Sequence, residues 1–217
     1  MRLYLDSARL SELQPLLGSG VFHGVTTNPL LLQEAGLGAA GLPGFARAVF
    51  QAGAKEVYLQ AWGTSAEVLY RCGLSLAGLD GRVVVKLPAT WEGLSAAGRL
   101  VLEGVRVCIT AAYLPHQALL ASAVGADFVA PYLGRINDSG QDGYTTIGRM
   151  SDLLRGIGSK TEILAASVRS IADVVALAQR GVRHVTLPLQ VAHRLFQEPL
   201  TLEAARQFER AMEEASL

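Results

Sequence analysis

One local pattern recurs along almost the whole chain and restricts the folds open to it. A β-branched or aromatic run leads through a polar turn into a segment with helical spacing of apolar residues, which ends in glycine. Gly53, Gly104, Gly125 and Gly181 stand at this junction in AGAKEVYL, EGVRVCI, VGADFVA and RGVRHVT. Glycine in that position ends a helix in the left-handed conformation. The chain is therefore predicted to consist of consecutive βα units.

The pattern can be followed through eight such units. We expect strands at Leu3–Asp6, Gly24–Asn28, Val57–Gln60, Val83–Lys86, Val105–Thr110, Asp127–Tyr132, Glu162–Ser167 and His184–Pro188. We expect helices at Arg9–Leu17, Gly44–Gln51, Ala66–Leu76, Trp91–Glu103, Pro115–Val124, Ile147–Ile157 and Ile171–Arg180, with Ser65, Thr90 and Ser170 as N-caps. This order favours a parallel (β/α)8 TIM barrel. A doubly wound open sheet is the alternative, but no glycine-rich phosphate fingerprint follows the first strand.

The end of the chain carries more helix than a barrel needs for closure. A short helix at Val191–Phe196 is followed by Pro199 and by an amphipathic segment, Thr201–Glu214. This extra helix is expected either to cover the barrel's outer face or to pack on a neighbouring subunit. No linker or low-complexity tract divides the sequence, so residues 1–217 are predicted to form a single domain.

Composition narrows the class of protein. Half of the 217 residues are hydrophobic, 18% are charged and the formal net charge is zero, so nothing suggests a nucleic-acid partner. No apolar stretch reaches the length of a membrane span, and MRLYLDSARL lacks a signal-peptide core. We therefore expect a cytoplasmic protein without membrane contact. Cys72 and Cys108 are interpreted as free thiols rather than as a disulfide.

Polar residues gather at the carboxyl ends of the expected strands, where barrel enzymes build their sites. In strand order they are Asp6; Thr26, Thr27 and Asn28; Gln60; Lys86; Thr110; Tyr132 with Arg135; and Ser167 with Arg169. The eighth strand ends in LPL and is expected to supply none. Singly, each has an ordinary explanation, such as a helix cap or a turn before proline. Their joint placement on one rim favours a functional site.

Lys86 is the hardest of these residues to explain structurally. It follows three valines in RVVVKLPAT, and lysine is rarely buried without a partner. Desolvation in a barrel mouth favours the neutral amine, which attacks a ketone to form an imine. Arg135, Arg169 and Ser167 could hold a phosphate. No His, Cys or carboxylate cluster has metal-ligand spacing, and the four histidines are interpreted as structural. The residues predict a Schiff-base lysine acting on a phosphorylated keto sugar without metal or cofactor.

Several blocks of the sequence resemble the transaldolase family. They are LYLDSA, GVTTNPLLL, VYLQA, VVVKLPAT–EGL, CITAA, ADFVAPYLGRI and ILAASVR, and together they cover nearly the whole chain. The sequence is most similar to the small bacterial branch that includes the fructose-6-phosphate aldolases.

The resemblance implies a role for each residue of the rim. It implies that Lys86 forms the Schiff base, that Asp6 and Asn28 contact substrate hydroxyls with Thr26 and Ser167 nearby, and that Arg135 and Arg169 grip the phosphate. It also implies a homo-oligomer, a pentamer-based decamer in which the last helix reaches a neighbour.

Two positions bear on the reaction. In this family, glutamate and phenylalanine are typical of transaldolases, whereas glutamine and tyrosine, here Gln60 and Tyr132, are typical of the aldolases. A water held by Gln60, Thr110 and Tyr132 would protonate the enamine and release dihydroxyacetone. The expected reaction is cleavage of fructose 6-phosphate to dihydroxyacetone and glyceraldehyde 3-phosphate.

Some alternatives stay open. The base at the C4 hydroxyl is either Tyr132 or Asp6. The competing functions are a transaldolase that transfers the dihydroxyacetone unit to erythrose 4-phosphate and a non-catalytic sugar-phosphate-binding barrel. A Schiff-base aldolase for another aldehyde, such as deoxyribose phosphate, is disfavoured by the GVTTNP block and the paired arginines.

Overall fold

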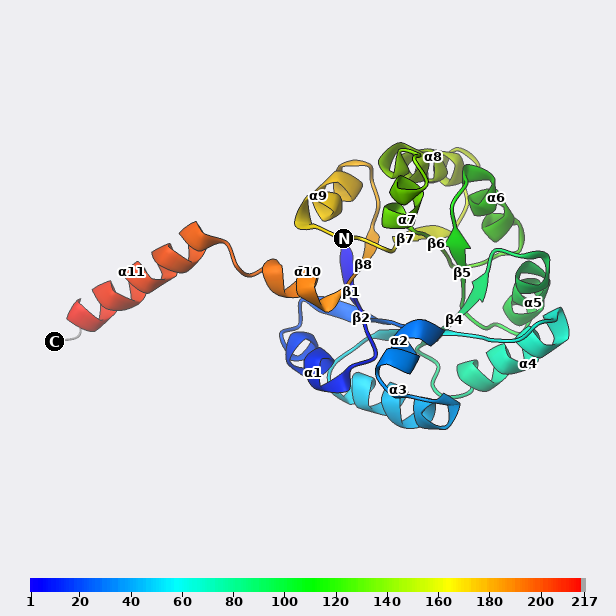
Figure 1. Ribbon diagram of the computed structural model, residues 1–217, viewed down its shortest axis with the longest axis horizontal. Helices are drawn as coiled ribbons and strands as arrows, with labels where there is room; N and C mark the ends of the chain where they lie inside the picture. Colours follow the sequence, from blue (N-terminus) through cyan, green and yellow to red (C-terminus); the bar gives the residue numbers. More distant parts are fainter. Residues whose placement is uncertain (216–217) are drawn as a thin grey trace.

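Each strand hydrogen-bonds in parallel with the next along the chain, and the last strand closes on the first. In the computed structural model, which describes residues 1–215, this gives a closed eight-stranded barrel ringed by helices (Figure 1). The strands are β1 (Arg2–Asp6), β2 (Phe22–Thr26), β3 (Glu56–Gln60), β4 (Val83–Pro88), β5 (Val107–Ala112), β6 (Phe128–Pro131), β7 (Glu162–Ala165) and β8 (His184–Leu187). The predicted (β/α)8 TIM barrel is confirmed.

The helices alternate with these strands along the chain. They are α1 (Leu10–Gly18), α2 (Pro29–Glu34), α3 (Leu42–Gln51), α4 (Ala66–Ala77), α5 (Trp91–Leu102), α6 (Pro115–Ala123), α7 (Leu133–Asp138), α8 (Gly143–Gly156), α9 (Ile171–Gln179), α10 (Leu189–Arg194) and α11 (Pro199–Ala215). A 3₁₀ turn, η1 (Ala39–Gly41), precedes α3. Ser65, Thr90 and Ser170 each accept a hydrogen bond from a backbone N–H in the first turn of α4, α5 and α9, as predicted.

The boundaries predicted from sequence need correction where a loop carries its own short helix. Helices α2 and α7 were not expected, because six residues are too few to show helical periodicity. The expected second strand ran on to Asn28, but that side chain caps α2 by accepting from Leu30 and Leu31 N–H. The fifth strand starts at Val107, since Val105 still bonds back to Leu100 of α5.

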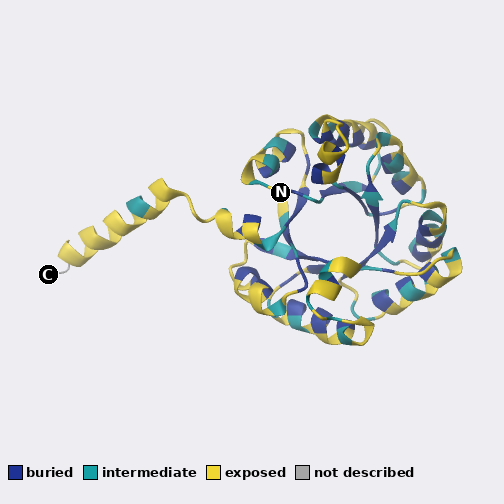
Figure 2. Cartoon of the chain, in the orientation of Figure 1, coloured by how far each residue is buried: buried dark blue, intermediate teal, exposed yellow. Residues whose placement is uncertain are grey.

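Side chains alternate between the two faces of the barrel wall. The odd-numbered residues of β4, such as Val83 and Val85, pack outward against the helices, whereas Val84 and Lys86 belong to the interior. One apolar cluster fills the middle of the interior: Tyr4, Tyr58, Val84, Cys108, Phe128, Ala130 and Leu164. Figure 2 shows the strands of this wall as a ring that is mostly dark blue. Interior residues beyond the cluster lie at one end of the barrel or the other.

The amino-terminal end is closed by a buried hydrogen-bond network centred on Glu56 of β3. Its carboxylate accepts from Tyr4 (2.8 Å), Tyr58 (3.1 Å) and Arg106 (2.7 Å). Burial alone would raise the pKa of Glu56, but hydrogen bonds from Arg106 and Tyr4 outweigh it, and the pKa lies below its ordinary value. His184 Nδ1 lies 3.1 Å from the Tyr4 hydroxyl, which extends the network to β8.

Helix α11 leaves the barrel and lies apart from it (Figure 1). None of its described residues is buried, and Leu200 and Phe208 are 79% and 70% exposed. Of the two roles expected for the terminal segment, covering its own barrel is therefore wrong. Cys72 and Cys108 are both free, as predicted. Within residues 1–215, no helix combines the length and apolar character needed to cross a membrane.

Replacing Glu56 with glutamine tests the network. Glu56 is buried and its charge pairs with the half-buried Arg106, so Glu56→Gln is expected to lower the free energy of unfolding by about 2–3 kcal/mol at pH 7. Because the pKa of Glu56 is depressed by folding, this contribution is full above its ordinary pKa of 4.5 and is lost as pH falls below it.

Urea unfolding at pH 7 and at pH 4 measures both effects. The wild type should lose more stability on acidification than Glu56→Gln does. Glu12→Gln, at an exposed ion pair with Arg9, serves as control and should change the free energy of unfolding by less than about 0.5 kcal/mol. Equal losses in wild type and Glu56→Gln would contradict the account.

Candidate active site

A small cavity of about 130 Å³ opens at the carboxyl ends of the strands. It is lined by Asp6, Thr26, Asn28, Lys86, Ala130, Tyr132, Arg135, Leu164, Ala166, Ser167 and Thr186. Seven residues predicted from the sequence thus meet in one place: Asp6, Thr26, Asn28, Lys86, Tyr132, Arg135 and Ser167.

Lys86 projects into this cavity from the end of a fully buried valine run. The residue is 5% exposed, and its Nζ donates a 2.6 Å hydrogen bond to the backbone carbonyl of Thr27. Within residues 1–215, no carboxylate lies within ion-pairing distance of Nζ. Among the described residues this carbonyl is its hydrogen-bond partner, and Nζ lines the cavity, where it can attack a bound carbonyl compound.

Asp6 is the carboxylate of the cavity. Its Oδ1 accepts a hydrogen bond from Thr26 Oγ1 at 2.7 Å. Burial raises the pKa of Asp6, while the charge of Lys86 and the hydrogen bond from Thr26 pull that pKa back down. A carboxylate with a raised pKa and access to the cavity can take up a proton during a reaction.

Tyr132 lines the cavity, whereas Thr110, its hydrogen-bond partner, lies behind it and outside the lining. Tyr132, just after β6, places its hydroxyl 2.7 Å from Thr110 Oγ1 on β5. Thr110 is followed by Ala111 at φ +57°, a left-handed conformation that a residue with a Cβ rarely adopts. Gln60 pairs in register with Lys86 on the neighbouring strand but does not line the cavity.

The two predicted phosphate-binding arginines are placed differently. Arg135 of α7 lines the cavity, with its guanidinium carbon 5.3 Å from the centre of the Tyr132 ring. Arg169 lies outside the lining, where both its terminal nitrogens bond to Asp138, at 2.7 and 2.5 Å. Ser167, between them, has φ +57°. Such a conformation costs free energy and is kept where the surroundings enforce it, often at functional sites.

Gly134 allows α7 to approach this segment closely. Its backbone N–H donates to the Ser167 carbonyl at 3.0 Å. A Cβ at position 134 would lie 2.7 Å from that oxygen and 2.6 Å from Arg169 Nε, which is too close for any side chain. The glycine thereby sets the spacing between Arg135 and Ser167.

Thr186 is a cavity residue that the sequence reading missed. The expectation that the eighth strand supplies no polar group is wrong, because Thr186 lines the cavity and lies 2.6 Å from Thr26 Oγ1. The error came from considering only the last residues of the strand. The two-residue alternation would have found it, since His184 points into the barrel and Thr186 shares its face.

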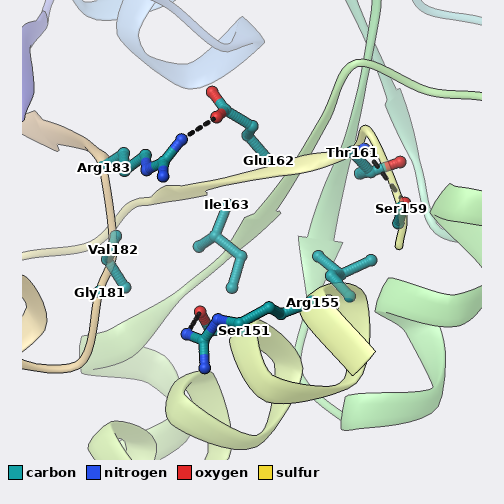
Figure 3. Close-up of a pocket in the computed structure, with 10 residues that line it drawn as sticks. Ser151, Arg155, Ser159, Thr161, Glu162, Ile163, Gly181, Val182 and Arg183 are labelled. Atoms are coloured by element: carbon teal, nitrogen blue, oxygen red, sulfur yellow. Dashed lines mark hydrogen bonds and ion pairs between the residues drawn. The ribbon is translucent and has the colours of Figure 1, made fainter. Parts of the chain in front are cut away.

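Other hollows lie away from this site. Figure 3 shows one of about 340 Å³ near the starts of β7 and β8, at the opposite end of the barrel, where Arg183 pairs with Glu162 at 3.4 Å. An apolar hollow of about 480 Å³ lies between α2 and Trp62. Neither contains a predicted site residue. Among the described residues there is no group of three or more His, Cys, Asp or Glu placed to hold a metal.

Known proteins resemble this chain over nearly its full length. The model of the transaldolase/fructose-6-phosphate aldolase family matches residues 3–217. A probable transaldolase of Anaeromyxobacter dehalogenans is 34% identical over 96% of this chain and 94% of its own. A probable transaldolase of Thermus thermophilus is 36% identical over 93% of both.

Solved structures share the architecture at much lower identity. A thiamine phosphate pyrophosphorylase from Pyrococcus furiosus superposes with a TM-score of 0.60 at 14% identity, covering 88% of this chain and 87% of that one. A mutant flavocytochrome b2 with benzoylformate gives a TM-score of 0.63 at 11% identity, over 87% of this chain and 57% of that one. These likenesses concern the barrel alone. The family match and the curated relatives go further: the chain belongs to the transaldolase/fructose-6-phosphate aldolase family.

Proposed function

We propose that the protein is a class I aldolase that reversibly cleaves fructose 6-phosphate to dihydroxyacetone and glyceraldehyde 3-phosphate. The observation that carries this proposal is Lys86, buried without an ion pair in a cavity that it shares with Tyr132, whose hydroxyl is hydrogen-bonded to Thr110. Family membership supports an enzyme of the aldolase or transaldolase type. We choose the aldolase because the Tyr132 hydroxyl, hydrogen-bonded to Thr110, can deliver a proton in the cavity.

The reaction begins with attack of Lys86 Nζ on the C2 ketone, and loss of water gives a protonated imine. A base, either Asp6 or Tyr132, removes the proton of the C4 hydroxyl. The C3–C4 bond then breaks, and its electron pair moves into the imine to form an enamine. Glyceraldehyde 3-phosphate leaves as the aldehyde.

The fate of the enamine decides the type of enzyme. A water held by Gln60, Thr110 and Tyr132 protonates its carbon, and hydrolysis of the resulting imine frees dihydroxyacetone and Lys86. The 2.7 Å hydrogen bond between Tyr132 and Thr110 supports this arrangement, since it orients the phenol at the cavity wall. Without proton delivery the enamine would wait for an acceptor aldehyde.

The phosphate is assigned to Arg135 and Ser167, with Arg169 as a further ligand. Arg135 already lines the cavity, but Arg169 would have to leave Asp138 or share its guanidinium with it. A phosphate offers more acceptor oxygens and more charge than a carboxylate, so it can compete for this exposed pair.

Transaldolase activity is the second candidate, and the names of the relatives favour it, because they are described as probable transaldolases. One experiment separates the two. Purified protein receives fructose 6-phosphate alone, and release of glyceraldehyde 3-phosphate is followed before and after erythrose 4-phosphate is added. Steady release without acceptor supports the aldolase. Release only with acceptor establishes the transaldolase instead.

Lys86→Met tests the imine. The variant is expected to lose all turnover, and borohydride reduction in the presence of dihydroxyacetone should no longer attach the three-carbon unit to the protein. The chain has two other lysines, Lys55 and Lys160, both exposed, so Lys160→Met is the matched control and should be labelled and active like the wild type. Unchanged sugar-phosphate binding without turnover in the wild type would indicate the non-catalytic barrel.

Tyr132→Phe tests proton delivery. Removing the hydroxyl is expected to slow cleavage of fructose 6-phosphate about 100-fold while transfer to erythrose 4-phosphate persists or rises. Tyr113→Phe is the control, because its ring lies 5.8 Å from that of Tyr132 but outside the cavity lining. If both activities fell together in Tyr132→Phe, the hydroxyl would not decide the fate of the enamine.

We also propose that the protein assembles as a homo-oligomer, a decamer, through α11. The helix lies apart from its own barrel (Figure 2). Its helical spacing places Leu202, Ala205 and Phe208 on one side. An amphipathic helix with an exposed apolar side gains stability by burying that side against another surface.

Phe208→Lys tests the assembly. Placing a charge on the apolar side of α11 is expected to reduce the mass measured by light scattering towards that of a single 23.0 kDa chain. Gln207→Lys adds a positive charge on the opposite side of the same helix and should keep the assembled mass. A wild type that already runs at the mass of one chain would contradict the oligomer.

A further inference from the structure

A chain of three side chains crosses the cavity wall on adjacent strands. Asp6 lies on β1, Thr26 on β2 and Thr186 on β8, and β1 pairs with both of the other strands. Thr26 Oγ1 lies 2.7 Å from Asp6 Oδ1 and 2.6 Å from Thr186 Oγ1. The two threonines are 1% and 2% exposed, so solvent does not compete for their hydroxyls.

The number of hydroxyl protons determines which group donates in each of these two hydrogen bonds. A threonine hydroxyl has one proton to donate and can accept two hydrogen bonds. An ionised Asp6 can only accept, so Thr26 donates its single proton to Oδ1. The contact between the threonines must then be donated by Thr186. The order is Thr186 to Thr26 to Asp6.

With this order of hydrogen bonds, one carboxylate oxygen of Asp6 receives no hydrogen bond from the described residues. No hydrogen bond within residues 1–215 reaches Oδ2, whereas Oδ1 is held by Thr26. The charged and titratable groups that share the cavity with Asp6 are Lys86 from β4, Tyr132 after β6 and Arg135 from α7. Oδ2 is therefore the oxygen available to a substrate hydroxyl.

We propose that Thr186 is a positioning residue that acts on Asp6 through Thr26: it commits the only hydroxyl proton of Thr26 to Oδ1 and leaves Oδ2 to receive a proton from the substrate. This rests on the proposed function and assigns Asp6 as the base. The C4 hydroxyl proton passes to Oδ2, the O–H electron pair forms the carbonyl bond, and the C3–C4 pair enters the imine on Lys86.

The electrostatic consequence has a definite sign. A hydrogen bond to the ionised form lowers the pKa of a carboxyl, and a hydroxyl that itself accepts a hydrogen bond is a stronger donor. Loss of Thr26 should raise the pKa of Asp6 by about one unit, and loss of Thr186 by about half a unit. Since Thr186 acts only through Thr26, losing both should do no more than losing Thr26.

The experiment measures protonation of Asp6 directly. Infrared difference spectra of the free protein follow the Asp6 carboxyl between low and neutral pH, with Asp6→Asn identifying its band. We expect the midpoint to rise in Thr186→Val, to rise further in Thr26→Val, and to stay at the Thr26→Val value in the double variant. Thr186→Ser keeps the hydroxyl and should restore the wild-type midpoint. Thr146→Val, a buried threonine of α8 outside the cavity, should leave it unchanged.

Kinetics then link the spectra to turnover. The acidic limb of the kcat/KM profile for fructose 6-phosphate should move up in pH with the infrared midpoint in Thr186→Val, with KM almost unchanged. An unmoved midpoint in Thr186→Val, or effects of the two threonines that add in full, would overturn the inference. A midpoint that shifts in Thr186→Val, in a protein whose wild type neither forms the imine nor turns over, would leave the threonine chain standing and reject the proposed function.

Discussion

The closed parallel barrel is the constraint on which the rest of the molecule depends. Because the sheet has no free edge, every strand residue faces either the helices or a narrow interior, and polar groups placed inside must find partners there. Polar and apolar residues of the interior are therefore arranged in three layers along the barrel. The Glu56 network closes the amino-terminal end, an apolar layer fills the middle, and the carboxyl ends hold Lys86 and its neighbours.

The layer at the carboxyl ends of the strands combines polar groups that differ in how many hydrogen-bond and ion-pair partners they have. Thr26 and Thr186 are buried and hydrogen-bonded, whereas Lys86 has one carbonyl partner and, in the described part of the chain, no carboxylate within ion-pairing distance. A nucleophile needs this incomplete satisfaction, since a firm ion pair would hold it as an ammonium. The strands supply the geometry. The left-handed conformations of Ala111, at an irregularity within β5, and of Ser167, just after β7, show that the backbone near the cavity is strained.

Features written in local patterns could be predicted from the sequence, whereas those set by packing could not. The strands, the caps at Ser65, Thr90 and Ser170, and the positive φ of Gly104 and Gly125 follow from residue type and spacing. So does the meeting of Asp6 and Lys86, once barrel closure brings strand ends together. The pairing of Arg169 with Asp138 depends on how α7 docks, which no periodicity encodes. Thr186 could also have been predicted from the sequence, by following which residues of the eighth strand face the interior instead of considering only its last residues.

The apolar layer between the two polar ends also affects how substitutions at one end influence the other. No side-chain hydrogen bond within residues 1–215 links the Glu56 network to the groups around Lys86. Changes at distant sites without shared partners combine additively. The hydrogen bonds and charges at the two ends can therefore be altered separately, by natural selection or in the laboratory. Changes in side-chain volume are coupled instead, because Ala130 and Leu164 of the cavity lining pack in the same cluster as Tyr4 and Tyr58.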